Sequence, residues 1–185
     1  QNNVSKPCID NSRLILMLCA AFSGPLIELI PSLESGGFHI RCESSRGKST
    51  ALRVCKSVWG DPSQLVTWRA TSNGLEGIAF MHNDSVLVLD ELGQMADENP
   101  TEAGQTAYML SNGASKQRAN RTGGSAQLKT WRLIFVSAGE ISLSTVMNQA
   151  GKMVKGGQEV RFIDIQADAG TGLGLFDTIH EYPGG

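Results

Sequence analysis

The chain has 185 residues, of which 41% are hydrophobic and 18% charged, and its formal net charge at pH 7 is -2. A chain of this length and composition buries one sizeable core, which excludes a disordered protein. The small negative net charge excludes a polyanion-binding surface spread over the whole chain, so any contact with nucleic acid has to come from a local basic segment.

The longest apolar run, residues 14–22, is too short to cross a bilayer and is followed by a Ser-Gly-Pro sequence. It also lacks the basic segment and the cleavage site of a signal peptide. We therefore expect a cytoplasmic protein with no membrane partner.

Because the chain starts at Gln1 rather than Met and ends on Pro-Gly-Gly, we expect a fragment of a longer protein. It should form a single domain over 1–185, with loosely structured ends at 1–10 and 166–185.

Apolar periodicity and turn residues predict five short strands that alternate with helices. Helices are expected at 13–22, 48–59, 72–82, 102–112 and 142–150, and a short helical stretch is expected to end at Ile30. Strands are expected at 38–41, 65–68, 85–90, 131–137 and 160–165. The third and fourth strands are continuous apolar runs, which is typical of strands buried on both faces of a parallel sheet. The pattern predicts an α/β domain with three layers and a mostly parallel five-stranded sheet.

Residues 42–49 match the phosphate-binding loop G-x-x-x-x-G-K-[ST], or Walker A motif, except that Cys42 stands at the first position. In such a loop backbone N–H groups surround an anion, Lys48 reaches the β- and γ-phosphates, and the Ser49 hydroxyl holds Mg²⁺. The expected nucleotide-binding residues are Ser44, Ser45, Arg46, Gly47, Lys48, Ser49 and Thr50. Cys42 leaves open the geometry at the start of the loop and the strength of nucleotide binding.

The apolar strand 85–90 ends in Asp90 and is followed by Glu91, as a Walker B element requires. Asp90 would hold Mg²⁺ through its water shell, and Glu91 would polarise the attacking water; the alternative is that these acids cap a helix. Ser137 ends the next buried strand and would orient the water or the γ-phosphate, unless it is only a satisfied strand-end hydroxyl. We therefore predict ATP and Mg²⁺ as cofactors, with Lys48, Glu91 and Ser137 as catalytic residues.

One strand lies between the phosphate-binding loop and the Asp-Glu strand. This order is that of the additional-strand ATPases with a catalytic Glu, which include AAA+ proteins and hexameric helicases and have a P-loop NTPase core of AAA+/RecA-like type. An adenylate-kinase-like phosphotransferase would place its acid differently.

The glycines at 170, 172 and 174 are spaced as in a dinucleotide fingerprint, but no βαβ unit follows them, so we expect a plain loop.

The sequence resembles the bacterial family known as domain of unknown function 927 (DUF927). The matching stretches are 36–39, 47–50, 68–71, 73–76, 90–91, 131–132, 137–140 and 157–161, which together span most of the chain. The family typically has glycine at the position of Cys42. The resemblance implies a helicase-like ATPase of phages and integrative elements, with a role in DNA replication.

Arg161 stands at the start of the last expected strand, where related ATPases often carry an arginine finger for the γ-phosphate of the neighbouring subunit. This role would make Arg161 a catalytic residue of a homo-oligomeric ring. The alternative is an ordinary surface or ion-paired arginine.

Segment 113–130 is basic and contains no acidic residue. Its four cations are Lys116, Arg118, Arg121 and Lys129. In ring helicases an insertion at this place forms a hairpin that contacts DNA in the channel, so these cations are the candidate nucleic-acid-binding residues. The alternative is a solvated basic loop.

Together these features predict an ATP-hydrolysing motor domain of a helicase-like translocase acting on single-stranded DNA, associated with replication in a mobile element. One alternative is an AAA+ ATPase that remodels proteins, which would carry an aromatic pore loop that we do not find between Asp90 and Trp131. Another is a nucleotide-dependent scaffold without hydrolysis, against which the retained Asp90, Glu91 and Ser137 argue. The choice between DNA and RNA stays open.

Overall fold

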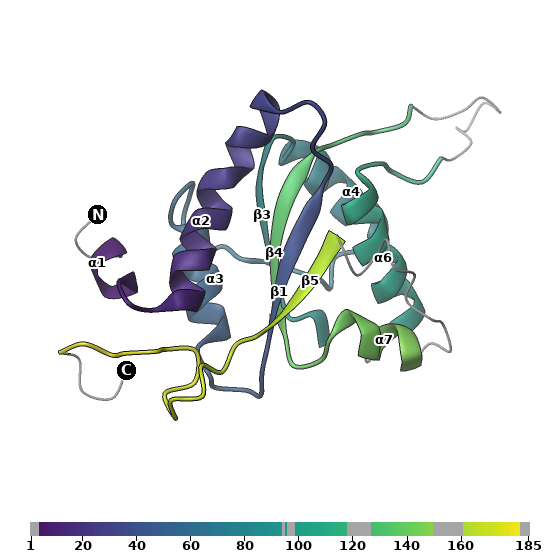
Figure 1. Cartoon of the computed structure of the whole chain (residues 1–185). Coiled ribbons are helices and arrows are strands. Elements are labelled where there is room, and N and C mark those ends of the chain that lie inside the picture. Colours follow the sequence, from purple (N-terminus) through teal and green to yellow (C-terminus); the bar gives the residue numbers. More distant parts are fainter. Residues whose placement is uncertain (1–3, 94, 96–98, 118–126, 150–160, 182–185) are drawn as a thin grey trace.

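Five parallel strands form the centre of the computed structural model (Figure 1). They are β1 (Gly36–Arg41), β2 (Val66–Thr67), β3 (Ser85–Asp90), β4 (Leu133–Gly139) and β5 (Phe162–Gln166). Their order across the sheet is β2-β3-β4-β1-β5, and every neighbouring pair is parallel. The structure describes residues 4–93, 95, 99–117, 127–149 and 161–181. Because all five strands run the same way, their carboxyl ends lie at one edge of the sheet.

Helices cover both faces of this sheet (Figure 1). On one face lie α1 (Ser5–Cys8), α2 (Ser12–Leu26), the 3₁₀-helix η1 (Ile27–Leu29) and α3 (Lys48–Lys56). On the other face lie α4 (Ser72–Met81), α6 (Pro100–Asn112) and α7 (Leu143–Gln149). The described helices and strands follow the expected order, with shifts of a few residues at their ends, but α1 was not expected, because it lies in segment 1–10, where the sequence predicted loose structure.

The sheet separates two hydrophobic cores. Val86 and Val88 of β3 belong to the core shared with α2 and α3, whereas Leu87 and Leu89 belong to the core shared with α4, α6 and α7. This alternation follows from the two-residue period of a strand, and it explains why the strand is apolar at every position. The predicted three-layer α/β architecture with a parallel five-stranded sheet is confirmed.

Helix α2 continues through Pro25 to Leu26, whereas the sequence predicted an end at Phe22. A proline at this position has no N–H to donate to the carbonyl of Ala21, one turn earlier. Trp59 Nε1 donates to that carbonyl instead, at 2.8 Å. The carbonyl is therefore satisfied, and the helix continues through Pro25, past the end at Phe22 that the sequence predicted.

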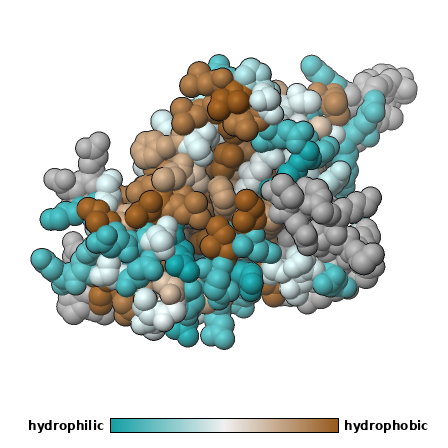
Figure 2. Space-filling model, viewed as in Figure 1, coloured by the Kyte–Doolittle hydropathy of each residue, from teal (hydrophilic) through white to brown (hydrophobic). Residues whose placement is uncertain are grey.

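The helical segment Ser12–Leu29 is long and apolar enough, by length and composition, to cross a membrane, although only 33% of it is buried inside the structure. It is longer than the apolar run 14–22 because the helix does not stop at the Ser-Gly-Pro sequence. One side of α2, including Leu14 and Met17, packs in the core. The other side leaves Phe22, Leu26 and neighbouring residues exposed, and Figure 2 shows this hydrophobic surface over α2.

Residues 167–181 follow β5 and run along the carboxyl edge of the sheet toward α1 (Figure 1). The backbone N–H of Leu175 donates to the carbonyl of Arg46 at 2.9 Å. The carboxylate of Asp177 accepts hydrogen bonds from the backbone N–H and the hydroxyl of Ser12, at 2.7 and 2.8 Å. The sequence predicted loose structure here because it gives no sign of these long-range partners.

The approach of α2 to the sheet yields a first prediction. A Cβ added at Gly24 would lie 2.6 Å from the carbonyl carbon of Ser85, whereas a Cβ added at Gly77 in α4 meets no atom within 4 Å. Gly24→Ala should lower the free energy of unfolding by about 1–3 kcal/mol through overpacking. Gly77→Ala should raise it by up to about 1 kcal/mol through helix propensity. Urea unfolding of the two variants checks this, and equal stability would contradict the packing argument.

Candidate nucleotide-binding site

A cavity of about 560 Å³ opens at the carboxyl edge of the sheet. Three loops form its walls, and they follow β1, β3 and β4. The lining residues are Ser44, Ser45, Gly47, Lys48, Ser49, Thr50, Asp90, Glu91, Gly93, Gly139, Glu140 and Ile141. In open α/β sheets ligands bind outside the carboxyl ends of the strands, so this cavity is the expected position for a substrate.

The loop between β1 and α3 turns through two residues in the left-handed region, Ser45 with φ 60° and Gly47 with φ 89°. Gly47 also lies against Leu175 and Phe176 of the C-terminal segment, since an added Cβ would be 3.3 Å from each side chain. A residue with a side chain would therefore be strained at this position. Cys42, in contrast, has a negative φ and a buried side chain, so the first position of the loop does not need glycine here.

Positive charge gathers on the floor of the cavity. Lys48 Nζ donates to the carbonyls of Cys42 and Glu43, at 2.6 Å each, so its ammonium group lies within the turn of the loop. The first turn of α3, which begins at Lys48, leaves backbone N–H groups without partners inside the helix. A lysine and a helix N-terminus in this arrangement have the charge and the N–H donors that an anion requires.

The loop and the acidic strand meet through one hydrogen bond. The Ser49 hydroxyl donates to Asp90 Oδ2 at 3.0 Å, while Asp90 Oδ1 accepts the backbone N–H of Glu91 at 2.9 Å. A hydroxyl and a carboxylate are hard oxygen ligands that fit Mg²⁺, which commonly uses one or two protein carboxylates together with water and phosphate oxygens. Among the described residues there is no group of three or more His, Cys, Asp or Glu side chains that would form a complete protein cage.

Two further carboxylates line the cavity. Glu91 is exposed and has φ 64°, a left-handed conformation that costs a non-glycine residue on the order of 1–3 kcal/mol and that clusters at functional sites. Glu140 follows β4 and is also exposed. The sequence analysis missed Glu140, although it stands directly after a buried strand, as Glu91 does.

Ser137 lies near the cavity but does not line it. Its side chain is fully buried, and Oγ lies 2.8 Å from Trp68 Nε1 and 3.0 Å from His39 Nδ1. His39 Nε2 in turn lies 3.0 Å from the carbonyl oxygen of Ile141, which is a cavity residue. The predicted strand-end hydroxyl is therefore fully engaged by protein groups, and His39 is a partner that the sequence analysis did not single out.

Two other predicted site residues do not reach the cavity. Arg161 precedes β5 and forms an ion pair with Glu34 at the amino edge of the sheet. The length of β5, about 17 Å at 3.3 Å per residue, separates Arg161 from the edge where its own chain's cavity opens. Arg46 belongs to the loop but turns away, because its guanidinium pairs with Glu43 at 3.7 Å and its carbonyl accepts the N–H of Leu175.

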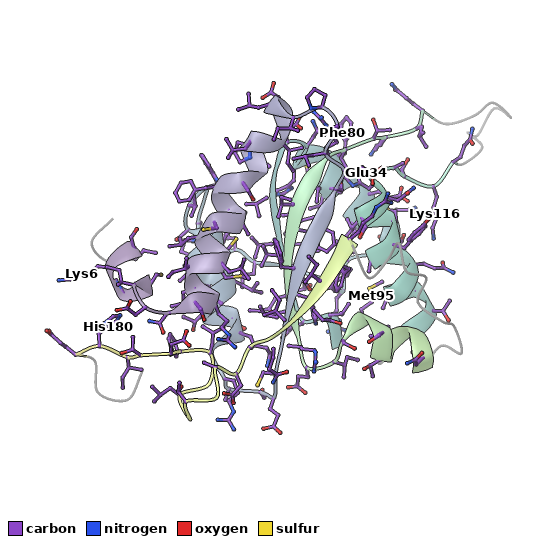
Figure 3. The ribbon with its side chains drawn as sticks, in the orientation of Figure 1. Lys6, Glu34, Phe80, Met95, Lys116 and His180 are labelled. Atoms are coloured by element: carbon purple, nitrogen blue, oxygen red, sulfur yellow. The ribbon has the colours of Figure 1, made fainter. Side chains whose placement is uncertain are left out.

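The basic segment 113–130, called the basic arm below, also leaves from the amino edge. Its two described ends are joined by an isolated antiparallel β-bridge between Ala114 and Thr130. Figure 3 shows Lys116 beside the point where the arm leaves the body. The backbone N–H of Lys116 donates to the buried carboxylate of Glu76, and Lys129 Nζ lies 5.8 Å from the centre of the Phe80 ring. The two other predicted cations, Arg118 and Arg121, lie outside the described residues.

A family model described as Domain of unknown function (DUF927) matches residues 1–130. The chain belongs to the DUF927 family. The resemblance noted from the sequence is thus confirmed for the family itself. No match was found among the curated proteins.

Among solved structures, this DUF927 chain is similar to a protein described as "SCCmec type IV Cch - active helicase", with a TM-score of 0.64 and 23% sequence identity. The match covers 89% of this chain and 31% of that chain, so this chain spans less than a third of the helicase. A second match, NtrX from Brucella abortus, has a TM-score of 0.38 and 15% identity over 76% of this chain and 34% of that chain, which is too distant to support an argument. This likeness concerns the fold, and it agrees with the predicted three-layer α/β core with a parallel sheet.

The burial of His39 yields a prediction about pH. Burial lowers the pKa of His39 to about 4, with a smaller contribution in the same direction from the charges of Arg41 and Lys48, while the hydrogen bond to Ile141 acts the opposite way. Between pH 6.5 and about 4 the unfolded chain therefore binds a proton that the folded chain does not. The free energy of unfolding should fall as the pH drops through this range, by up to about 3 kcal/mol from this residue.

Urea unfolding at several pH values between 7 and 4 measures this effect as the difference between the wild type and His39→Gln. Partial burial raises the pKa of Asp164 to about 6, and this carboxyl contributes to stability with the opposite sign. Its contribution is present in both proteins and cancels in the difference. If the two proteins lose stability in parallel, His39 does not titrate as its burial requires.

Proposed function

We propose that this DUF927 domain binds ATP with Mg²⁺ and hydrolyses it as the motor domain of a helicase-like nucleic-acid translocase. The observation that carries the proposal is the 3.0 Å hydrogen bond between Ser49 and Asp90. It joins the end of the anion-binding loop, which follows β1, to the acid at the end of the buried strand β3, inside a cavity that also holds Lys48 and Glu91. These residue types in this arrangement suit phosphoryl transfer from a nucleoside triphosphate to water.

Each side chain has a role that follows from its position. Lys48 and the first turn of α3 would bind the phosphates, and Ser49 and Asp90 would hold the metal ion. Glu91 would orient a water molecule and accept its proton as the water oxygen bonds to the γ-phosphorus and the bond to the β-phosphate oxygen breaks. Mg²⁺ would neutralise the charge that develops on the transferred group. The products are ADP and inorganic phosphate.

Nucleic acid would bind at the other edge of the sheet. The basic arm carries the four cations and no acidic residue; the Ala114–Thr130 bridge joins its two described ends to each other, and the backbone N–H of Lys116 joins one end to Glu76 in α4. Clustered cations of this kind suit contacts with phosphates, and we propose single-stranded DNA as the partner. The likeness of the fold to an active helicase supports this reading. A replication role in a mobile element and a cytoplasmic location are part of the same proposal.

Arg161 would act only in an assembly. It lies at the edge opposite its own cavity and pairs with Glu34, so it would have to leave Glu34 to reach the γ-phosphate bound by a neighbouring copy. A homo-oligomeric ring would provide such a neighbour. The ring, and the activity of a longer protein of which this domain would be a part, belong to the proposal.

Replacement of Glu91 tests the hydrolysis step. Glu91→Gln should leave ATP affinity nearly unchanged and lower kcat by about a hundredfold, because the amide cannot accept the proton of the attacking water. Glu28→Gln, an exposed site on η1 at the amino edge, is the matched control and should behave as the wild type. Lys48→Ala should abolish binding itself. Steady-state ATPase assays and titration with a fluorescent ATP analogue measure these effects, and unchanged turnover in Glu91→Gln would reject the catalytic role.

The basic arm is tested by the salt dependence of binding to single-stranded DNA. Replacing Lys116, Arg118 and Arg121 by Ala should weaken binding to all sequences alike and flatten the slope of log affinity against log salt by about two units, since each phosphate contact contributes about 0.7. Basal ATPase activity should persist.

The matched control removes three cations on the opposite face of the sheet, Lys6, Arg53 and Lys56, which lie in α1 and α3. Figure 3 shows Lys6 on the far side of the molecule from Lys116. This control should leave the slope unchanged. If both triple variants flatten the slope equally, the arm is only part of the general charge of the protein; if neither does, it does not contact phosphates.

A further inference from the structure

Beneath the cavity, three fully buried side chains form a line of hydrogen bonds from Trp68 through Ser137 to His39, which ends at the carbonyl of Ile141. We call these three residues the buried relay. They come from three strand regions: Trp68 follows β2, Ser137 lies in β4, and His39 lies in β1, with β3 between the first region and the other two. His39 and Ser137 are direct partners in the parallel register of β1 and β4. The register therefore sets their contact.

The chemistry of the groups allows only one direction for the relay. The indole N–H of Trp68 can only donate, so Ser137 Oγ accepts from it. The carbonyl of Ile141 can only accept, so His39 carries its proton on Nε2 and donates there. His39 Nδ1 is then an acceptor, and the hydroxyl proton of Ser137 points to it. Every polar atom of the relay has a partner, which a buried network needs in order to hold one geometry.

Both ends of the relay reach the walls of the cavity. The backbone N–H of Trp68 donates to the carbonyl of Asp90 at 3.1 Å. At the other end, a Cβ added to Gly139 would lie 3.1 Å from His39 Cε1 and 3.3 Å from the Cβ of Leu92, so the chain at Gly139 is packed directly on the imidazole ring. The relay thus spans the distance from the Asp90 strand to the wall formed by residues 139–141.

We infer that His39 is a positioning residue of the nucleotide site: through Ile141 and Gly139 it holds the 139–141 wall, and with it the Glu140 carboxylate, at a fixed place opposite Ser49 and Glu91. The inference rests on the proposed function as far as nucleotide is concerned. In this arrangement Ser137 does not touch the substrate. It acts through His39, by fixing the tautomer that can donate to Ile141.

Packing alone does not require this arrangement. His39 also stacks on Phe162, with ring centroids 5.4 Å apart, and an aromatic ring without nitrogen atoms would keep that contact. The nitrogen atoms add only the two directional hydrogen bonds, to Ser137 and to Ile141. The two nitrogen atoms of His39 therefore fix the position of the wall formed by residues 139–141. Catalysis depends strongly on the position of the groups that line the site.

The test compares His39→Phe, which keeps a ring and removes both hydrogen bonds, with His39→Gln, which keeps a donor and an acceptor. The matched control is His82→Phe, since His82 Nδ1 also lies 2.8 Å from a backbone carbonyl, that of Ile78, away from the cavity. Each 185-residue variant is examined by amide hydrogen exchange without nucleotide, by titration with a nonhydrolysable ATP analogue, and by steady-state ATPase assays. All measurements are made without urea, at a temperature where every variant is folded.

We expect His39→Phe to raise amide exchange at residues 139–142 by about tenfold or more while amides of α2 stay unchanged. Its kcat should fall by about tenfold, and its affinity for the analogue should stay within about threefold, because the phosphate-binding loop is untouched. His39→Gln should recover most of both effects. His82→Phe should alter neither the exchange of the wall nor kcat.

The inference is overturned if His39→Phe leaves the exchange of residues 139–142 unchanged, if exchange rises equally throughout the chain, or if His39→Gln is no better than His39→Phe. A loss of affinity that matches the loss of kcat would also overturn it, since it would show a general collapse of the site. If the wild type neither binds nor hydrolyses ATP, the proposed function fails, and the exchange measurement alone decides whether His39 fixes the wall.

Discussion

The parallel pairing of β1, β4 and β3 is the constraint on which the site depends. Each of these strands ends at the same edge of the sheet, and each is followed by a loop that carries polar residues. The pairing thereby brings Ser49 within hydrogen-bonding distance of Asp90, which lies 41 residues further along the chain. No local conformation could join these groups, so the site exists only when the sheet is complete.

The same geometry divides the molecule into two working edges. The carboxyl edge holds the cavity, whereas the amino edge holds Arg161 and the roots of the basic arm. Strand β4 connects the two directly, because it follows the arm through Trp131 and ends at Gly139 in the wall of the cavity.

The sequence predicted the parts of the site that short motifs encode. Lys48, Ser49, Asp90 and Glu91 all line the cavity, because their positions follow from being next to a strand end. The direction of a side chain within a strand is harder to predict, since a shift of one residue turns it to the other face. The end of a strand is also hard to predict. The sequence placed the strand end at Ser137, which suggested a role at the γ-phosphate, whereas β4 continues to Gly139 and the Ser137 hydroxyl is bound between Trp68 and His39.

Contacts between distant segments were the least predictable. The pairing of Arg161 with Glu34 joins residues 127 positions apart, and the packing of Leu175 on Gly47 depends on how the C-terminal segment returns to the phosphate-binding loop. His39 belongs to the same group, because it becomes notable only through its neighbours in space, whereas the position of Glu140 directly after a buried strand is visible in the sequence. Local pattern therefore gave the fold and the main chemical groups, whereas the supporting contacts required the structure.

The replacement of a backbone hydrogen bond in α2 by a side chain has an evolutionary consequence. The carbonyl of Ala21 is satisfied by Trp59 because Pro25 cannot satisfy it. A relative with a residue other than proline at position 25 would have a backbone N–H that can donate to the carbonyl at position 21. Position 59 would then not need a side chain that donates to this carbonyl. Positions 25 and 59 are therefore constrained as a pair, and a history in which proline arose before the indole would have passed through a less stable intermediate sequence.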